Sequence, residues 1–150
     1  TILGGYFGSR LMKNIREDKG YTYGIYSMMM SFQQAGVFLI ASEVGAEVCQ
    51  RAVDEIYKEL KILNTELIVQ DELELVKRYM AGSVLRSFDG PYQVADRFKS
   101  LLKYGINYKK YYMDFMNTIN AVTAEDLLHT SQKYLQESSM LELIVGKAGK

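Results

Sequence analysis

The chain has 150 residues and no formal net charge, since 18 Lys and Arg residues balance 18 Asp and Glu residues. Hydrophobic residues make up 48% and charged residues 24% of the sequence, a composition typical of one globular domain with its own core. The charge balance argues against broad nucleic-acid binding, the single cysteine excludes an intrachain disulfide, and no apolar run approaches the roughly 20 residues of a membrane helix.

The N-terminal part of the chain predicts a helix followed by a β-hairpin. Leu11 and Ile15 share a helix face at i, i+4 spacing, and residues 18–20 then indicate a turn. An aromatic, β-prone stretch predicts one strand, and an apolar stretch predicts a second strand that should be buried. Because only residues 33–34 separate the strands, they should pair in antiparallel fashion. The expected ranges are 8–16 for the helix, 21–32 for the first strand and 35–44 for the second.

The rest of the chain predicts five helices and a closing strand. Thr123 to Asp126 resembles a capping box with Asp in place of the usual Glu, which indicates a helix start. An apolar, β-prone stretch at residues 141–145 predicts a strand that returns to the hairpin. The expected helix ranges are 46–63, 69–88, 91–104, 108–119 and 123–135. The side chains expected to face inward on the helix at 69–88 are Leu73, Val76, Met80 and Leu85.

This order of elements predicts an α+β fold, in which helices pack on one face of an antiparallel sheet. A single proline and the absence of any low-complexity linker indicate one domain over residues 1–150.

The residues needed for catalysis within this chain are missing from the sequence. His129 is the only histidine, and the residues after it do not form the inverted H-x-x-E-H zinc motif. Cys49 lies beside the apolar stripe of a predicted helix, where a small buried hydrophobe is expected. The glycines of residues 4–8 lack the spacing and the lysine of a phosphate-binding loop, which makes a nucleotide-binding module the weakest of the functions considered. We therefore predict no catalytic residue, metal or cofactor in this chain.

The segment from Arg16 to Gly24, R-E-D-K-G-Y-T-Y-G, carries the most functional information. Arg16 ends a predicted helix, Gly20 turns the chain, and Tyr23 lies on the following strand. The turn could bring the guanidinium and the phenol hydroxyl to one side, where both could donate hydrogen bonds to a peptide carbonyl or carboxylate. The alternative is a surface ion pair between Arg16 and a neighbouring carboxylate, with Tyr23 packed in the sheet.

Three stretches of the sequence together resemble a known domain. They are Ile2 to Leu11 (I-L-G-G-x-x-x-S-R-L), Ile15 to Tyr23 (R-E-x-x-G-x-x-Y), and a closing part with Val122 to Leu127, Lys133 to Leu135 and Leu143 to Gly146. The chain resembles the second homologous domain of pitrilysin/insulinase-type zinc peptidases, close to the mitochondrial-processing-peptidase-like branch. This resemblance implies a metallopeptidase (LuxS/processing-peptidase-like) half-domain, truncated at its N-terminus before Thr1.

The resemblance also implies roles for two residues. In that family, two homologous domain types form a clam-like chamber; one carries the zinc motif, and the other supplies an Arg and a Tyr that contact bound peptide near the zinc. Those roles fall on Arg16 and Tyr23. A tyrosine at Tyr21 departs from the small or aliphatic residue that is usual there, and Tyr21 should share a strand face with Tyr23. The spacing from Arg16 favours Tyr23 for the role.

The expected function is therefore that of a substrate-binding, non-zinc domain of a zinc endopeptidase, inactive alone. Its expected partners are a peptide or unfolded-protein substrate and a zinc-bearing homologous domain or subunit, with a homodimer or heterodimer left open and no nucleic acid or membrane span. The alternative is a catalytically inactive structural subunit of the same family. The compartment is left open, with a soluble protein of the bacterial cytoplasm or periplasm as the expectation.

Overall fold

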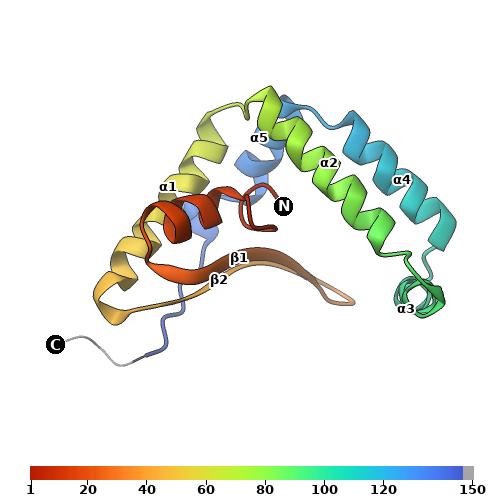
Figure 1. Ribbon diagram of the computed structural model, residues 1–150, viewed down its shortest axis with the longest axis horizontal. Coiled ribbons are helices and arrows are strands. Elements are labelled where there is room, and N and C mark those ends of the chain that lie inside the picture. The colour runs from red at the N-terminus through yellow and green to blue at the C-terminus, as the bar shows by residue number, and fades with distance from the viewer. Residues whose placement is uncertain (147–150) are drawn as a thin grey trace. The chain divides into compact units, whose positions relative to one another are not determined.

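The computed structural model describes residues 1–146, and these residues divide into two compact units. Unit 1 contains Thr1–Leu67 and the chain from Leu127 onwards, and unit 2 contains Ile68–Asp126. Figure 1 labels the helices and strands of both units. The α+β class with an antiparallel sheet is confirmed, while the prediction of one domain over residues 1–150 stays a prediction.

Unit 1 begins with a turn-rich loop that leads into the helix η1 (Met12–Asp18), a π-helix preceded by α-helical residues 10–11. The helix thus lies about two residues further along the chain than expected. Leu11 and Ile15, the two residues that predicted it, are both completely buried. Gly20 then adopts a φ of 64°, a left-handed conformation that glycine tolerates without strain, and the chain reverses into the first strand.

The two strands β1 (Thr22–Ser31) and β2 (Gly36–Val44) form the expected antiparallel hairpin. Ser27 pairs with Ile40, and both lie on the face that packs against the core, whereas the outward face is exposed. The outward-facing residues are Tyr26, Met28, Met30, Val37 and Leu39. The prediction of a buried second strand is wrong, because helices cover only one face of this hairpin and the described part of β2 has no fully buried residue.

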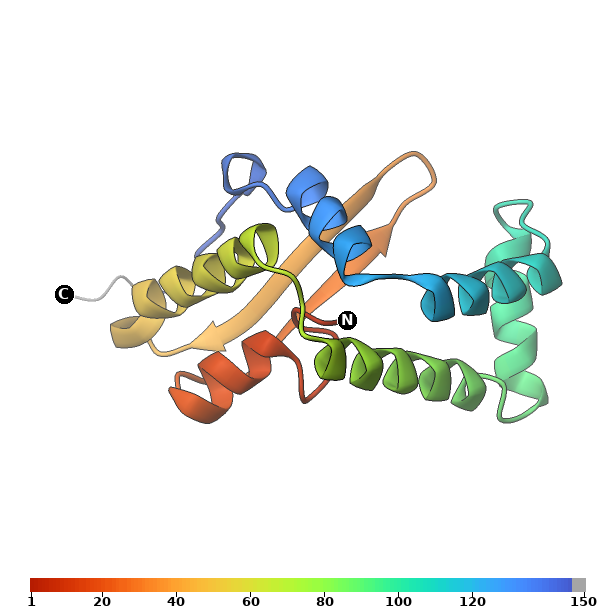
Figure 2. The same cartoon turned by 90° about the horizontal axis from the view of Figure 1, so that it is seen from above.

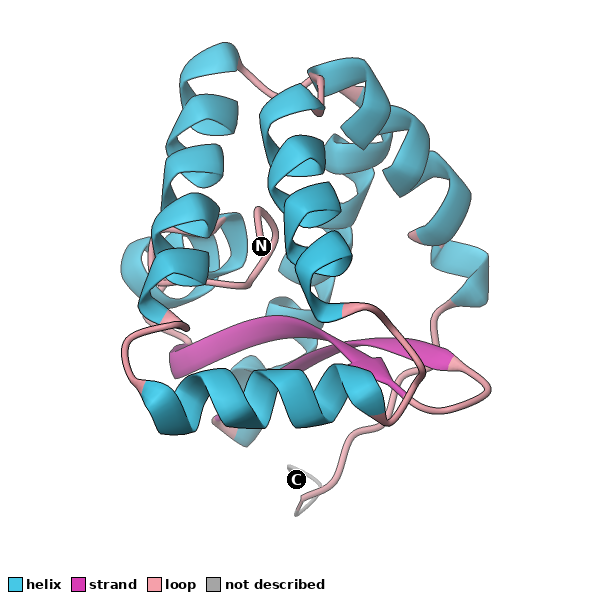
Figure 3. Ribbon diagram, turned by 90° about the vertical axis from the view of Figure 1, so that its right-hand side faces the viewer, coloured by secondary structure: helices cyan, strands magenta, loops and turns pink. Residues whose placement is uncertain are grey.

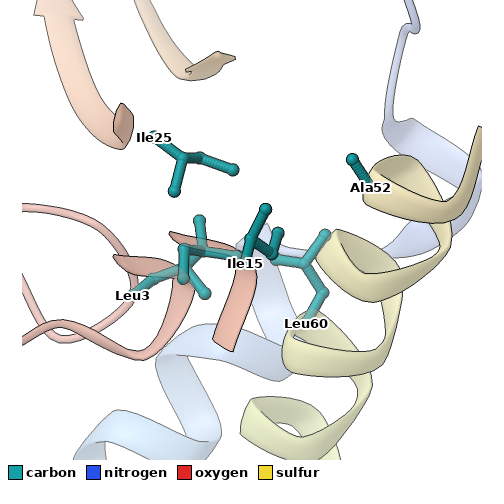
Figure 4. Close-up of a cluster of buried hydrophobic side chains, with 6 residues drawn as sticks. Leu3, Ile15, Ile25, Ala52 and Leu60 are labelled. Atoms are coloured by element: carbon teal, nitrogen blue, oxygen red, sulfur yellow. The ribbon is translucent and has the colours of Figure 1, made fainter. Parts of the chain in front are cut away.

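The helix α1 (Cys49–Thr65), which follows a 3₁₀ turn η2 (Ala46–Val48), lies with η1 on one side of the hairpin (Figures 1 and 2). Its buried stripe includes Ala52 and Leu60, whose spacing of eight residues puts them on one helix face. Figure 4 shows how these side chains meet those of the loop, η1 and β1 in one apolar cluster. The buried members of this cluster are Leu3, Leu11, Ile15, Ile25, Ala52 and Leu60.

The C-terminal part of unit 1 is tied to the end of α1. Within α5 (Ala124–Tyr134), Ser131 Oγ donates a hydrogen bond to the Leu63 carbonyl at 2.5 Å. Asn64 Nδ2 donates to the Leu135 carbonyl at 2.8 Å. A short 3₁₀ turn η3 (Glu137–Ser139) follows. These bonds bring the C-terminal segment back beside α1.

The predicted closing strand is wrong for the described residues. Residues 141–145 are in no strand, and Leu141 and Val145 are 94% and 87% exposed. A strand needs a neighbour with unpaired backbone groups, and this segment has no strand partner among residues 1–146. One side-chain contact does hold it, since Tyr57 Oη lies 2.7 Å from Glu142 Oε1.

Unit 2 consists of the helices α2 (Gln70–Arg86), α3 (Pro91–Leu102) and α4 (Tyr108–Ala121), which Figure 1 labels. Figure 3 colours all helices of the chain cyan and the two strands magenta. Leu73 and Val76 of α2 are buried, as expected, and Ile119 of α4 is buried too. The prediction for Leu85 is wrong, because its side chain is 70% exposed near the end of α2. Edge-to-face contacts among three rings then join the end of α2 to α4; the rings are Phe88, Tyr108 and Tyr112.

The predicted capping box at the start of α5 is confirmed. The backbone N–H of Asp126 donates to Thr123 Oγ1 at 3.2 Å, and the backbone N–H of Thr123 donates to Asp126 Oδ2 at 3.0 Å. The shorter Asp side chain therefore completes the reciprocal pair that Glu usually makes.

Candidate functional site

One open cleft in unit 1 brings together the segment that the sequence singled out. Its volume is about 690 Å³, and it lies where the end of η1, the start of β1 and the end of β2 meet a residue of the N-terminal loop. Arg16 and Tyr23 both line it. The remaining lining residues are Phe7, Glu17, Gly20, Tyr21, Thr22, Glu43, Val44 and Gly45.

Arg16 is placed at the cleft by the last turn of η1 and by an aromatic ring beneath it. Its guanidinium carbon lies 4.6 Å from the centroid of the Phe7 ring, a distance typical of a cation–π contact. Within the described residues, the Arg16 side chain makes no ion pair, so the expected alternative of a surface pair with Glu17 or Asp18 is not formed there. The edge of the guanidinium, which carries its N–H donors, is therefore not occupied by a carboxylate.

Tyr23 and Tyr21 differ strongly in their surroundings. The Tyr23 side chain is 100% exposed, so it is not packed in the sheet as the alternative required. Tyr21 precedes β1, is half-buried against the core, and has the Arg51 guanidinium 5.2 Å from its ring centroid. Both tyrosines line the cleft, but only Tyr23 presents its whole ring and hydroxyl to solvent.

A β-bulge explains why Tyr23 projects freely. The pairing of the two strands shifts between Thr22 and Ile25, so the residues between them have no regular partner on β2. The side chain of Thr22 fills the gap, because its Oγ1 donates to the Glu43 carbonyl at 2.6 Å and accepts from the Gly24 N–H at 3.1 Å. The bulge is thus held closed by hydrogen bonds, and Tyr23 stands out from it.

Side chains of the types that bind metal ions do not gather in one place in the described part of the chain. Residues 1–146 contain no group of three or more His, Cys, Asp or Glu side chains that could hold a metal ion. His129 is exposed on α5, and Cys49 is a half-buried free thiol at the start of α1. The described residues therefore do not fit a zinc site. None of the helices in that part of the chain has the length and apolar character to cross a membrane.

Two features of the cleft were missed at the level of sequence. Glu43 and Val44 line it because β2 ends beside the start of β1, and the short hairpin turn was a signal from which this pairing could have been found. Phe7 gave no such signal, since its place under Arg16 depends on the path of an irregular loop.

Comparison with known proteins shows which family the chain belongs to. Residues 1–80 match the family described as the peptidase M16 inactive domain. The chain belongs to the peptidase M16 family. The predicted relationship to the pitrilysin/insulinase zinc peptidases is thereby confirmed, and so is the assignment to the domain that lacks the zinc motif.

Two relatives of this M16 domain carry the name of uncharacterized zinc proteases. The protein YmxG of Bacillus subtilis (strain 168) is 32% identical over 145 residues, which cover 96% of this chain and 35% of YmxG. A protein of Rickettsia felis is 28% identical over 137 residues, covering 88% of this chain and 32% of the relative. The chain thus spans about a third of the length of the curated relatives it matches.

Solved structures agree with the fold of the M16 domain. A peptidase M16 inactive domain from Pseudomonas fluorescens has a TM-score of 0.78 at 29% identity, over 90% of this chain and 32% of that one. A putative zinc protease from Bordetella pertussis Tohama I has a TM-score of 0.72 at 18% identity, over 92% of this chain and 76% of that one. The second likeness, at this identity, bears on the fold alone.

Proposed function

We propose that this M16 domain binds the peptide substrate of a zinc endopeptidase, and that Arg16 and Tyr23 contact the bound peptide. The proposal rests on one observation: both side chains line one open cleft. Within the described residues, neither of them is paired with a carboxylate, so their hydrogen-bond donors are available to a ligand. The zinc would belong to a homologous domain or a separate subunit, because residues 1–146 do not fit a zinc site.

The two side chains suit a peptide in different ways. A guanidinium offers N–H donors in one plane and can bind a carboxylate or two successive carbonyl oxygens. A phenol hydroxyl donates a single hydrogen bond, which strengthens when the accepting carbonyl oxygen gains negative charge. Arg16 is therefore assigned to holding the peptide, and Tyr23 to a carbonyl close to the bond that is cleaved.

The proposal is tested by the kinetics of the full-length protein together with its zinc-bearing domain or subunit. We expect Arg16→Ala and Tyr23→Phe each to lower kcat/KM for an unstructured peptide by about tenfold or more, the effect of losing one charge-assisted hydrogen bond. Tyr26→Phe is the matched control, since Tyr26 is 50% exposed on the same strand but does not line the cleft.

A loss below about threefold for both variants, equivalent to ~0.7 kcal/mol, would contradict the assignment. It would favour the alternative of a structural subunit, in which the same substitutions leave peptide cleavage unchanged. We infer as partners a peptide or unfolded-protein substrate and a zinc-bearing M16 domain. The naming of both relatives as zinc proteases supports this inference.

A further inference from the structure

Phe7 combines two properties that are unusual for one side chain. Its ring is 61% exposed to solvent, yet it lies directly under a functional residue, 4.6 Å from the Arg16 guanidinium carbon. It also lines the same cleft as Arg16 and Tyr23. A large exposed aromatic ring contributes little to the core, so its position is better explained by what it does for Arg16.

The loop that carries Phe7 is fixed at both ends. Ahead of Phe7, the backbone N–H of Ser27 in β1 donates to the Gly4 carbonyl at 2.8 Å. Behind it, the backbone N–H of Ser9 donates to the Tyr6 carbonyl at 3.1 Å and so closes a tight turn around Phe7. The ring is therefore attached to a loop whose path is defined by backbone hydrogen bonds.

The approach of this loop to β1 requires glycine. A Cβ atom on Gly4 would meet the backbone nitrogen of Ser27 at 2.6 Å, closer than real Cβ contacts come. The neighbouring Leu3 is only 4% exposed and belongs to the core cluster. The I-L-G-G stretch thus acts as an anchor that sets where Phe7 stands.

An aromatic ring positions an arginine differently from a carboxylate. The ring attracts the cation over the face of the ring, through its quadrupole, and accepts no conventional hydrogen bond from the guanidinium N–H groups. A carboxylate would instead occupy two of the edge donors in a fork. Phe7 and Arg16 line the same cleft, 4.6 Å apart, and this contact leaves the N–H donors of Arg16 free of a carboxylate.

We propose that Phe7 is a positioning residue for substrate binding: its ring holds the Arg16 guanidinium over the cleft with the donor edge directed to the acceptor groups of a peptide. This inference rests on the proposed function of Arg16 and extends it to a residue outside the Arg–Tyr pair. Because the attraction comes from the quadrupole of the ring, an apolar side chain of similar bulk should not replace Phe7.

The test is a set of variants in the full-length protein with its zinc-bearing domain or subunit. Phe7→Leu keeps an apolar side chain but removes the ring, and we expect kcat/KM for an unstructured peptide to fall about three- to tenfold. Phe7→Tyr keeps the ring and should stay within about twofold of the wild type. The double variant Phe7→Leu with Arg16→Ala should be no worse than Arg16→Ala alone, because the ring acts through Arg16.

The outcomes separate this inference from the proposed function. If Arg16→Ala lowers kcat/KM but Phe7→Leu does not, the role of Phe7 is wrong while that of Arg16 stands. Equal losses for Phe7→Leu and Phe7→Tyr, or additive losses in the double variant, would also overturn it. If Arg16→Ala has no effect, both proposals fall. Matching thermal melts of all variants would show that the losses do not come from unfolding.

Discussion

Asn14 offers a quantitative test of how unit 1 is held together. Its side-chain amide donates one hydrogen bond to Glu59 Oε1 at 2.7 Å and another to Glu55 Oε2 at 3.2 Å. Both glutamates are only 9% exposed, on the side of α1 that faces η1. A hydrogen bond to a charged acceptor contributes about 1.5–3 kcal/mol. Asn14→Ala removes both bonds.

The loss of the bond to Glu59 and the loss of the bond to Glu55 should lower the free energy of unfolding by different amounts. Glu55 keeps Lys58 at 2.5 Å and Lys19 at 3.6 Å, whereas within the described residues Asn14 is the one side chain that donates to Glu59. The stronger loss is therefore at Glu59, and the longer bond adds less. We expect Asn14→Ala to lower the free energy of unfolding by about 2–4 kcal/mol.

Urea unfolding at pH 7, followed by circular dichroism, measures this change. The matched control is Asn117→Ala, because Asn117 is exposed on α4 and, among the described residues, makes no side-chain hydrogen bond. The control should change the free energy of unfolding by less than about 0.5 kcal/mol. If Asn14→Ala costs no more than the control, the hydrogen bonds to the two buried carboxylates do not stabilise the fold as described.

Two further predictions concern stability. Gly4→Ala should lower the free energy of unfolding by about 1–3 kcal/mol, because the new Cβ would meet the Ser27 nitrogen at 2.6 Å. Calorimetry measures this change, and a melting curve that matches the wild type would refute the prediction. The pKa of Glu55 is held below its ordinary 4.5, mainly by the hydrogen bond from Lys58. The ionised carboxylate therefore stabilises the fold above about pH 4.5, and this stabilisation is lost as the pH falls through the lowered pKa. The stability difference between the wild type and Glu55→Gln should therefore shrink from pH 7 to pH 3, and a constant difference would count against the ionised pair.

The sequence predicted the parts of the fold that depend on local pattern. The i, i+4 pair Leu11 and Ile15 located the first helix, and Thr123 with Asp126 located the start of α5. Burial could not be predicted in the same way. Val37 was expected in a buried strand but is 48% exposed, because burial depends on which elements cover a face and not on the strand pattern alone.

In the candidate site, too, local sequence pattern predicted some features and tertiary packing decided the others. The spacing of Arg16 and Tyr23 around a glycine turn indicated that they could share a surface, and they line one cleft. The ring of Phe7 could not be foreseen, because an irregular loop carries it there. Glu59 was missed for another reason: a carboxylate on a helix is expected to face solvent, and its burial depends on a partner, Asn14, in a distant part of the sequence.

The claim that a bound peptide contacts Arg16 and Tyr23 is tested most directly by mapping where a substrate touches this chain. A photoreactive phenylalanine analogue is placed at position 23, or at position 26 as the control, in the full-length protein with its zinc-bearing domain or subunit. After irradiation with an unstructured peptide, mass spectrometry measures the crosslinked fraction. We expect efficient crosslinking from position 23, reduced by the further substitution Arg16→Ala, and little crosslinking from position 26. Equal yields from both positions would contradict it.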